Sequence, residues 1–95
     1  MRDAQSLDYS LDDRFWDIKA LYRDELAENP RLGQGELKAV ITIEPNGVVS
    51  NVRLESSEIT AQRFLNRVRD LMLRWRFESG DYTRAVVQKT FDLRP

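Results

Sequence analysis

The side chains that most often carry catalysis or bind metals are absent from this sequence. Its 95 residues include no cysteine and no histidine. Their absence excludes thiol nucleophiles, disulfides, imidazole acid–base catalysis and most zinc sites. Carboxylates remain, but none stands in an apolar stretch that would tune it for acid–base work. The sequence therefore predicts a protein that is not an enzyme and uses no cofactor.

One acidic group has the composition of a cation site. Asp12, Asp13 and Asp17 stand close together near the expected start of a helix. A calcium loop would also need a central glycine and a terminal glutamate, and both are missing. Acidic residues are favoured near a helix N-terminus by the helix dipole, which explains these three without a metal. We predict no metal site.

Arginines concentrate in a later segment and offer a second kind of chemistry. Residues 61–76 hold five arginines and one aspartate, Asp70. Three of the arginines share one helical face and form a candidate basic patch for an anion or an acidic peptide: Arg63, Arg67 and Arg74. The competing interpretation is a solvated face, neutralised by Asp70 and by the acidic residues of segment 8–28. The chain has 15 basic and 16 acidic residues, so net charge gives no general affinity for nucleic acid.

Apolar periodicity predicts the helices that would carry these charges. Residues 1–9 read as a flexible arm, and Ser10 with Asp13 resembles a capping box. A helix over roughly residues 11–28 then ends at Asn29-Pro30, because the residue before proline avoids the helical region. A second helix, over roughly residues 61–75, has Thr60 as its expected cap. The two apolar stripes repeat every three or four residues: Leu11, Phe15, Ile18, Tyr22 and Leu26, then Phe64, Val68, Leu71, Met72 and Trp75.

Alternating apolar residues predict three strands, over residues 36–44, 48–55 and 83–93. Pro45, Asn46 and Gly47 form a tight turn between the first two. A type I turn with a glycine bulge places Ile43 opposite Val49. In a regular strand the later apolar residues Val52 and Leu54 would then face the opposite side of the sheet from Val49. We therefore predict a β-bulge near Ser50-Asn51. The side chains expected on the covered face of the sheet are Leu37, Ala39, Ile41, Ile43, Val52, Leu54, Val87, Phe91 and Leu93.

These elements predict one α+β domain over residues 10–95, in the order α-β-β-α-β. A helical crossover places the last strand beside the first, so the three-stranded antiparallel sheet has the order 2-1-3 with both helices on one face. We expect Tyr22, Trp75 and Phe77 in the core, although Trp75 and Phe77 could alternatively form a ligand-stacking surface. Gly33-Gln34-Gly35 reads as a connector, because it matches neither a phosphate loop nor a GXXG clamp.

Several short motifs occur in a familiar order. Residues 21–22 are Leu-Tyr, residues 29–32 are Asn-Pro-Arg-Leu, and residues 43–49 are Ile-Glu-Pro-Asn-Gly-Val-Val. Residues 75–77 are Trp-Arg-Phe, and residues 91–93 are Phe-Asp-Leu. With Leu26, Val52 and Ser56, this arrangement over about residues 12–94 resembles the AgmX/PglI C-terminal domain family, a relative of the TonB C-terminal domain. Family members often carry a pair of cysteines, and Leu21 stands at the position of the first.

The resemblance implies a role in binding. TonB-like C-terminal domains lie in the periplasm, at the soluble end of proteins anchored in the inner membrane and powered by a proton-driven motor complex. They grip a peptide of an outer-membrane receptor by adding it as a strand, and AgmX/PglI-type domains are linked to motility and envelope machinery. By resemblance, we expect a periplasmic module of an energy-transducing, transport or motility system that binds an envelope protein. The alternatives are a nucleic-acid-binding or regulatory α/β domain, and a homodimerisation domain.

The predicted topology specifies where such a partner would bind. The last strand would form a sheet edge with unpaired backbone groups, which is a template for an incoming peptide. Arg84 and Lys89 are charges that would guard this edge against self-pairing, and Pro95 cannot extend the ladder. The edge residues expected to bind the partner are Arg84, Val86, Val87, Gln88, Lys89, Thr90 and Asp92.

Overall fold

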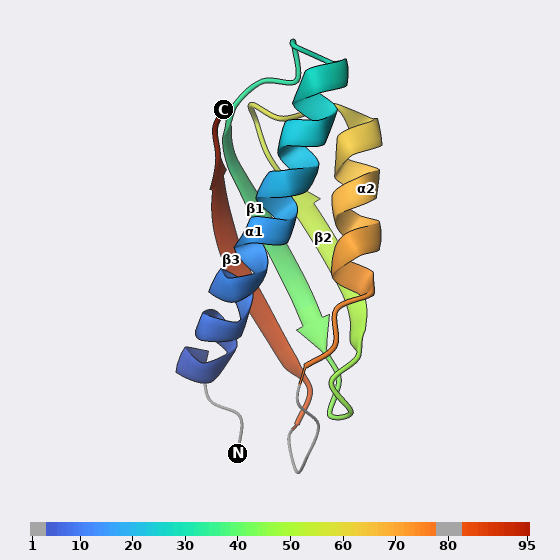
Figure 1. Ribbon diagram of the computed structural model, residues 1–95. Coiled ribbons are helices and arrows are strands. Elements are labelled where there is room, and N and C mark those ends of the chain that lie inside the picture. The colour runs from blue at the N-terminus through green and yellow to red at the C-terminus, as the bar shows by residue number, and fades with distance from the viewer. Residues whose placement is uncertain (1–3, 78–82) are drawn as a thin grey trace.

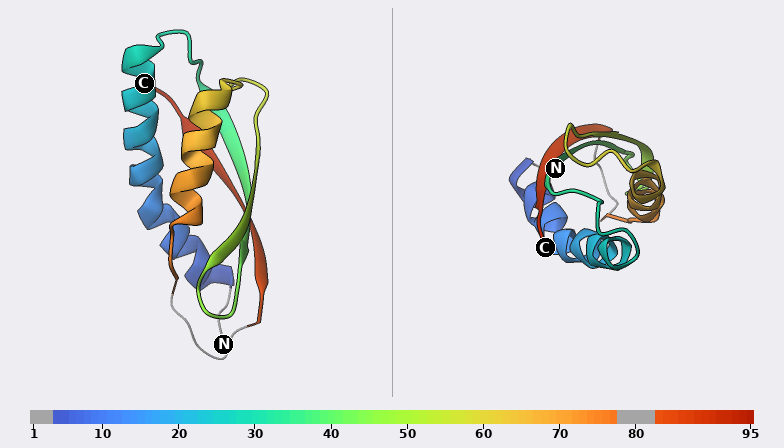
Figure 2. Two further views of the ribbon diagram at one scale, coloured as in Figure 1. Left: turned by 90° about the vertical axis from the view of Figure 1, so that its right-hand side faces the viewer. Right: turned by 90° about the horizontal axis from the view of Figure 1, so that it is seen from above.

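The computed structural model describes residues 4–77 and 83–95, with side chains described from Arg14 onward. The elements follow in the order α1 (Ala4–Glu28), β1 (Gly35–Ile43), β2 (Val49–Glu55), α2 (Gln62–Leu73) and β3 (Ala85–Leu93) (Figure 1). The three strands form an antiparallel sheet in the order β2-β1-β3. Both helices lie on the same face of this sheet, as the side view in Figure 2 shows. The predicted α+β fold and strand order are therefore confirmed.

The hairpin register confirms the predicted bulge. Ile43 pairs with Val49, whereas the preceding residue, Thr42, pairs with Asn51. Ser50 is therefore the extra residue, and it returns Val52 to the covered face opposite Ile41. Gly47 adopts a φ of +85° in the connecting turn. A side chain there would meet the carbonyl oxygen of Phe77, so glycine is required by close approach as well as by backbone conformation.

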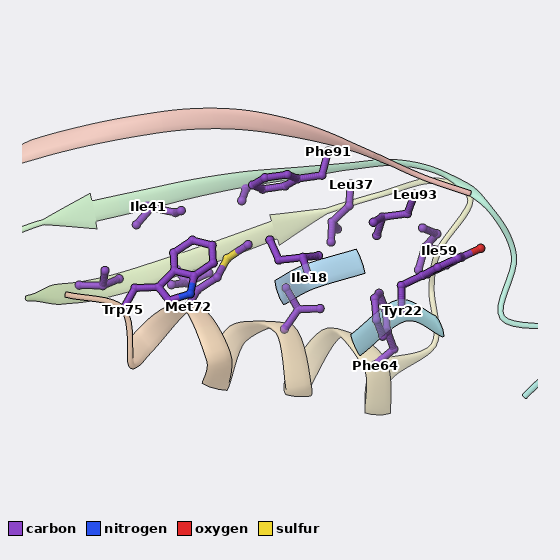
Figure 3. Close-up of a cluster of buried hydrophobic side chains, with 14 of the residues drawn as sticks. Ile18, Tyr22, Leu37, Ile41, Ile59, Phe64, Met72, Trp75, Phe91 and Leu93 are labelled. Atoms are coloured by element: carbon purple, nitrogen blue, oxygen red, sulfur yellow. The ribbon is translucent and has the colours of Figure 1, made fainter. Parts of the chain in front are cut away.

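The helix-facing side of the sheet forms the core together with the two helices (Figure 3). Alternate residues of β1 are buried from Leu37 to Ile43, as the period of two predicts. Leu54 and Val87, predicted for the same face, are only half-buried. The rings of Tyr22 and Phe64 join the two helices in an edge-to-face contact with centroids 5.8 Å apart.

The hydroxyl of Tyr22 forms a hydrogen bond at the edge of this core. Its ring is fully buried, and its hydroxyl donates a hydrogen bond to the carbonyl oxygen of Gly33. Burial raises the pKa of the Tyr22 phenol, and the positive charge of Arg94 opposes part of this rise. The expected position, with the ring in the core and the hydroxyl at its edge, is confirmed.

α1 ends where the sequence predicts but begins earlier. The amide of Asn29 still donates to the carbonyl of Glu25 at 2.8 Å, and Pro30 prevents a further turn. The predicted start at residue 11 is wrong, because the helix begins at Ala4. Residues 4–9 contain no glycine or proline to interrupt helix formation, so the chain is helical well before Ser10. Ser10 therefore lies inside the helix and does not cap it, and residues 1–3 of the predicted arm lie outside the described residues.

α2 is shorter than predicted at both ends. Ala61 occupies the N-cap position with no side-chain hydrogen bond, so the expected cap at Thr60 is wrong. The path of the chain into α2 is fixed instead by Ile59. This side chain is fully buried, and the Ile59 amide donates a hydrogen bond to the hydroxyl of Ser56 at 3.0 Å. The helix ends at Leu73, and Trp75 lies in the following connector.

Candidate protein-binding edge

β3 pairs on one side only within the described residues. All nine of its residues pair with β1, from Ala85 opposite Ile43 to Leu93 opposite Gly35. In an antiparallel ladder, alternate residues direct their amide and carbonyl groups away from the paired neighbour. The outer side of β3 therefore carries backbone donors and acceptors that β1 does not use.

The opposite edge of the sheet, β2, is less regular. Arg76 forms an isolated antiparallel bridge with Val48, and the amide of Phe77 donates to the carbonyl of Gly47 at 2.9 Å. The connector after α2 therefore covers the start of β2, and the bulge at Ser50 interrupts its ladder. β3 is the longer and more regular of the two edges.

The predicted edge residues divide between two faces of the sheet. Val87 and Lys89 share the helix-covered face with Phe91, and both are half-buried. Val86 is 67% exposed and is the apolar member of the outward-facing residues of β3. The residues of β3 on the face away from the helices are Val86, Gln88, Thr90 and Asp92.

Charges at the two ends of β3 have partners within the chain. The Nε of Arg84 lies 3.0 Å from Oε1 of Glu44, which follows β1. Two hydrogen bonds lower the pKa of the Glu44 carboxyl. The larger effect comes from the Ser50 hydroxyl and the smaller one from Arg84. At the other end, Asp92 Oδ1 lies 2.9 Å from Nε of Arg94. These exposed pairs fix side-chain positions more than they stabilise the fold.

A groove lies beside the second half of β3. It has a volume of about 470 Å³ and is lined by Phe15 of α1 and by residues 89–92 of β3. The rings of Phe15 and Phe91 stack here with centroids 5.5 Å apart and an interplanar angle of 4°. The first turns of α1 lie beside the first half of β3, on the side away from β1 (Figures 1 and 2). Residues 89–92 are therefore the stretch at which an added strand would meet the groove.

The arginines of the predicted basic patch lie among acidic side chains. Arg67 Nη1 lies 2.8 Å from Oε1 of Glu25, whose side chain is only 4% exposed. Arg63 contacts the same carboxylate at 3.5 Å and Glu28 at 2.7 Å. Arg74, at the C-cap of α2, lines a groove of about 440 Å³ between the helices together with Arg67, and Asp17, Asp24 and Asp70 line it as well. The acidic first helix therefore neutralises two of the three arginines, which favours the interpretation of a solvated face.

Trp75 and Phe77 belong to the core and do not form a ligand-stacking surface. Both are buried, and their rings meet edge to face with centroids 6.5 Å apart. Arg14 lies over the Phe77 ring at 4.4 Å and donates to the carbonyl of Arg76 at 2.8 Å. The indole Nε1 of Trp75 is buried without a hydrogen-bond partner in the part of the chain that the structure describes.

Sequence reasoning missed the two contacts that define these surfaces. Glu25 appeared only as one acid in a charged segment, although its side chain is nearly inaccessible. Phe15 was assigned to the apolar stripe, where it belongs, but its stacking on Phe91 at the sheet edge depends on how α1 crosses β3. Helical periodicity gives the face on which a residue lies but not the strand that this face meets.

Among residues 4–77 and 83–95, no group of three acidic side chains is placed to hold a metal ion. Neither described helix is both long and apolar enough to span a bilayer. No protein-family model and no curated protein sequence matches this chain. The edge of β3, the groove beside it and the charges around them are therefore the features that point to a function.

Proposed function

We propose that this chain is a non-enzymatic protein-binding module that receives an extended peptide as an added strand on the outer edge of β3. The observation that carries the proposal is the single-sided pairing of β3 next to the groove at Phe15 and Phe91. Backbone hydrogen bonds to such an edge supply affinity for any extended chain, and a neighbouring groove supplies selectivity among side chains.

The cellular setting of the proposal comes from the resemblance to AgmX/PglI and TonB C-terminal domains. On that basis the module works in the periplasm, as the soluble end of an inner-membrane-anchored protein. It binds a peptide of an envelope protein or outer-membrane receptor and transmits force from a motor complex in energy transduction, transport or motility. The lack of histidine and cysteine supports a binding role over an enzymatic one.

The alternative of nucleic-acid binding has little support. Proteins that bind single strands on a sheet stack bases on exposed aromatic side chains surrounded by basic residues. On the uncovered sheet face, the described residues of β1 and β3 are polar, charged or aliphatic: Glu36, Lys38, Val40, Thr42, Val86, Gln88, Thr90 and Asp92. Arg63 and Arg67, the basic residues that such a function would use, already bind Glu25.

Backbone methylation of a bound peptide tests the strand-addition mode. A nine-residue peptide selected from a displayed library would be resynthesised in two forms, with alternate amides methylated at odd or at even positions. Because only alternate amides of an added strand face β3, one form should lose binding and the other should keep it. Equal loss or equal retention would rule out strand addition.

Amide mapping of the unmodified peptide locates the site independently. The largest chemical-shift changes should fall within residues 89–92, with smaller changes around Phe15 of α1. Changes confined to the helices, with β3 silent, would contradict the proposed edge.

A further inference from the structure

The groove between α1 and α2 has an apolar part that both helices contribute. It has a volume of about 440 Å³ and is lined by Leu21 of α1 and Leu71 of α2, which are half-buried against the core. Ala20, beside Leu21, is small and exposed and leaves room above them. Apolar surface that a groove leaves open to solvent gains free energy when another apolar side chain covers it.

The charges around this apolar part are predominantly negative. The charged residues that line the groove are Asp17, Asp24, Arg67, Asp70 and Arg74. Arg67 is already neutralised, because its guanidinium contacts the buried carboxylate of Glu25 at 2.8 Å. In the part of the chain that the structure describes, the three aspartates and Arg74 form no salt bridge. Three carboxylates therefore stand against one guanidinium, and the groove carries a net negative charge.

The spacing of the acids along α1 matches a helical partner. Asp17 and Asp24 are seven residues apart, which corresponds to two turns and about 10 Å of helix. Residues seven apart on a second helix lying along the groove have the same spacing and share one face. On an extended strand, residues that share a face are about 7 Å or about 13 Å apart, so a strand does not match these two acids equally well.

We infer that the groove between α1 and α2 binds an amphipathic helix of a partner protein. This helix carries basic residues at positions i and i+7 and apolar residues between them at i+3 and i+4, the usual pattern of a helix that docks in a groove. The basic residues face Asp17 and Asp24, and the apolar residues cover Leu21 and Leu71. The site shares no lining residue with the groove at β3, so it goes beyond the proposed strand addition.

The sign of the charge argues against other occupants. A second copy that docked groove to groove would bring the same excess of carboxylates, and like charges across an interface repel. Nucleic acid and anionic membranes are disfavoured for the same reason. Among the described residues no three acids are placed to hold a metal ion, so the complementary charge comes from basic side chains of another protein.

The two ends of the groove differ in their attraction for a basic side chain. The helices run in opposite directions (Figure 1), so Arg67 lies at the Asp24 end and Arg74 at the Asp17 end. Because Arg67 is bound to Glu25, Asp24 keeps most of its attraction, whereas Arg74 offsets part of the attraction of Asp17. Asp24→Asn should therefore weaken the binding of a basic helix more than Asp17→Asn does.

Three alanine-based helical peptides test the inference on the full chain. Each has two adjacent leucines at its centre. The first has one lysine three positions before the leucine pair and one three positions after it, a pattern that reads the same in both directions. The second has glutamates at these two positions, and the third has the two lysines moved to the opposite face of the helix.

Amide chemical-shift titration gives both the affinity and the location of binding. The third peptide should bind about fivefold more weakly than the first, because two exposed charge pairs are lost, and the second about tenfold more weakly or worse, because both pairs become repulsive. For the first peptide, the largest changes should fall on residues 17–24 and 67–74. Circular dichroism of the free peptides would confirm equal helix content.

Charge reversal on the protein supplies the decisive control. The double variant Asp17→Lys with Asp24→Lys should prefer the glutamate peptide to the first lysine peptide. Both side chains are exposed on α1, so the fold should be retained. The matched control is Glu36→Lys with Glu58→Lys, which changes the net charge equally at two exposed residues outside the groove. It should keep the original order of affinities. Far-UV circular dichroism would confirm that each variant is folded.

The possible failures are distinguishable from failure of strand addition. Equal affinities for the first and third peptides would show that only net charge matters and would overturn the inference. So would shift changes confined to the sheet, or absence of binding by all three peptides at millimolar concentration. Sedimentation showing a dimer that the Asp17 and Asp24 double variant dissociates would assign the groove to a second copy and overturn it as well. The methylated peptides test β3 separately in every case.

Discussion

Replacing Arg67 with methionine removes the main partner of a buried carboxylate. Glu25 is 3% exposed, and Arg67 contacts its Oε1 at 2.8 Å. Methionine keeps the length and the helix-forming tendency of the side chain but not its charge. The substitution therefore leaves Glu25 with Arg63 as its remaining partner, at 3.5 Å and more exposed to solvent.

The structure limits the size of the effect. Removing one partner of a fully buried ion pair costs about 3–5 kcal/mol, because the other charge stays buried. Here the Arg67 side chain is 37% exposed and Arg63 still screens the carboxylate, so the loss is smaller. We expect Arg67→Met to lower the free energy of unfolding by about 2 kcal/mol, between the values for buried and exposed pairs.

Urea unfolding followed by circular dichroism measures this loss. With a slope of about 1 kcal/mol per molar urea, the midpoint should fall by about 2 M. Arg63→Met on the same helix is the matched control and should cost less than about 1 kcal/mol, because that side chain is 67% exposed. Adding Glu25→Gln to Arg67→Met should recover part of the loss, since the buried charge is removed.

Equal midpoints for the two arginine variants would refute this reasoning. So would a double variant that is less stable than Arg67→Met alone, because the cost would then not come from an uncompensated carboxylate. Either result would reopen the interpretation of Arg63, Arg67 and Arg74 as a binding surface.

Three further outcomes follow from the core and its rim. Trp75→Ala should lower the free energy of unfolding by about 3–5 kcal/mol, and an unchanged urea midpoint would remove Trp75 from the core. Gly47→Ala should cost more than about 1 kcal/mol, because its φ of +85° disfavours a side chain and its Cβ would collide with the Phe77 carbonyl oxygen; a wild-type thermal midpoint would show that the turn opens freely. Tyr22 has a raised pKa in the folded state, so its contribution is complete below about pH 10 and is lost as the pH rises through the folded pKa. Tyr22→Phe should flatten this alkaline loss, and identical profiles of stability against pH for the two proteins would contradict the assignment.

Much of the fold follows from local rules in the sequence. The alternation of Leu37, Ala39, Ile41 and Ile43 predicts β1 and its buried face, because side chains on a strand alternate strictly. Val49 and Val52 would face opposite sides of the sheet in a regular strand, and this predicts the bulge at Ser50. Without the extra residue, the apolar side chains after it would be exposed. Pro30 similarly ends α1 through a purely local steric effect.

The ends of the helices that lack such a signal were predicted less well. Nothing between Ala4 and Ser10 stops a helix, and a capping motif by itself does not start one. Thr60 resembles a cap, but the burial of Ile59 determines where the chain enters α2. Tertiary packing overrides local propensity at both positions.

The candidate site depends almost entirely on tertiary structure. The sequence identifies β3 as an edge through the order 2-1-3, and it gives the faces on which Lys89 and Phe91 lie. It does not reveal that α1 crosses β3 at Phe15 and forms a groove there, or that Glu25 is buried against Arg67. Periodicity determines which side of an element is apolar, whereas the crossing of elements distant in sequence decides which charges are neutralised and which strand edge remains open to a partner.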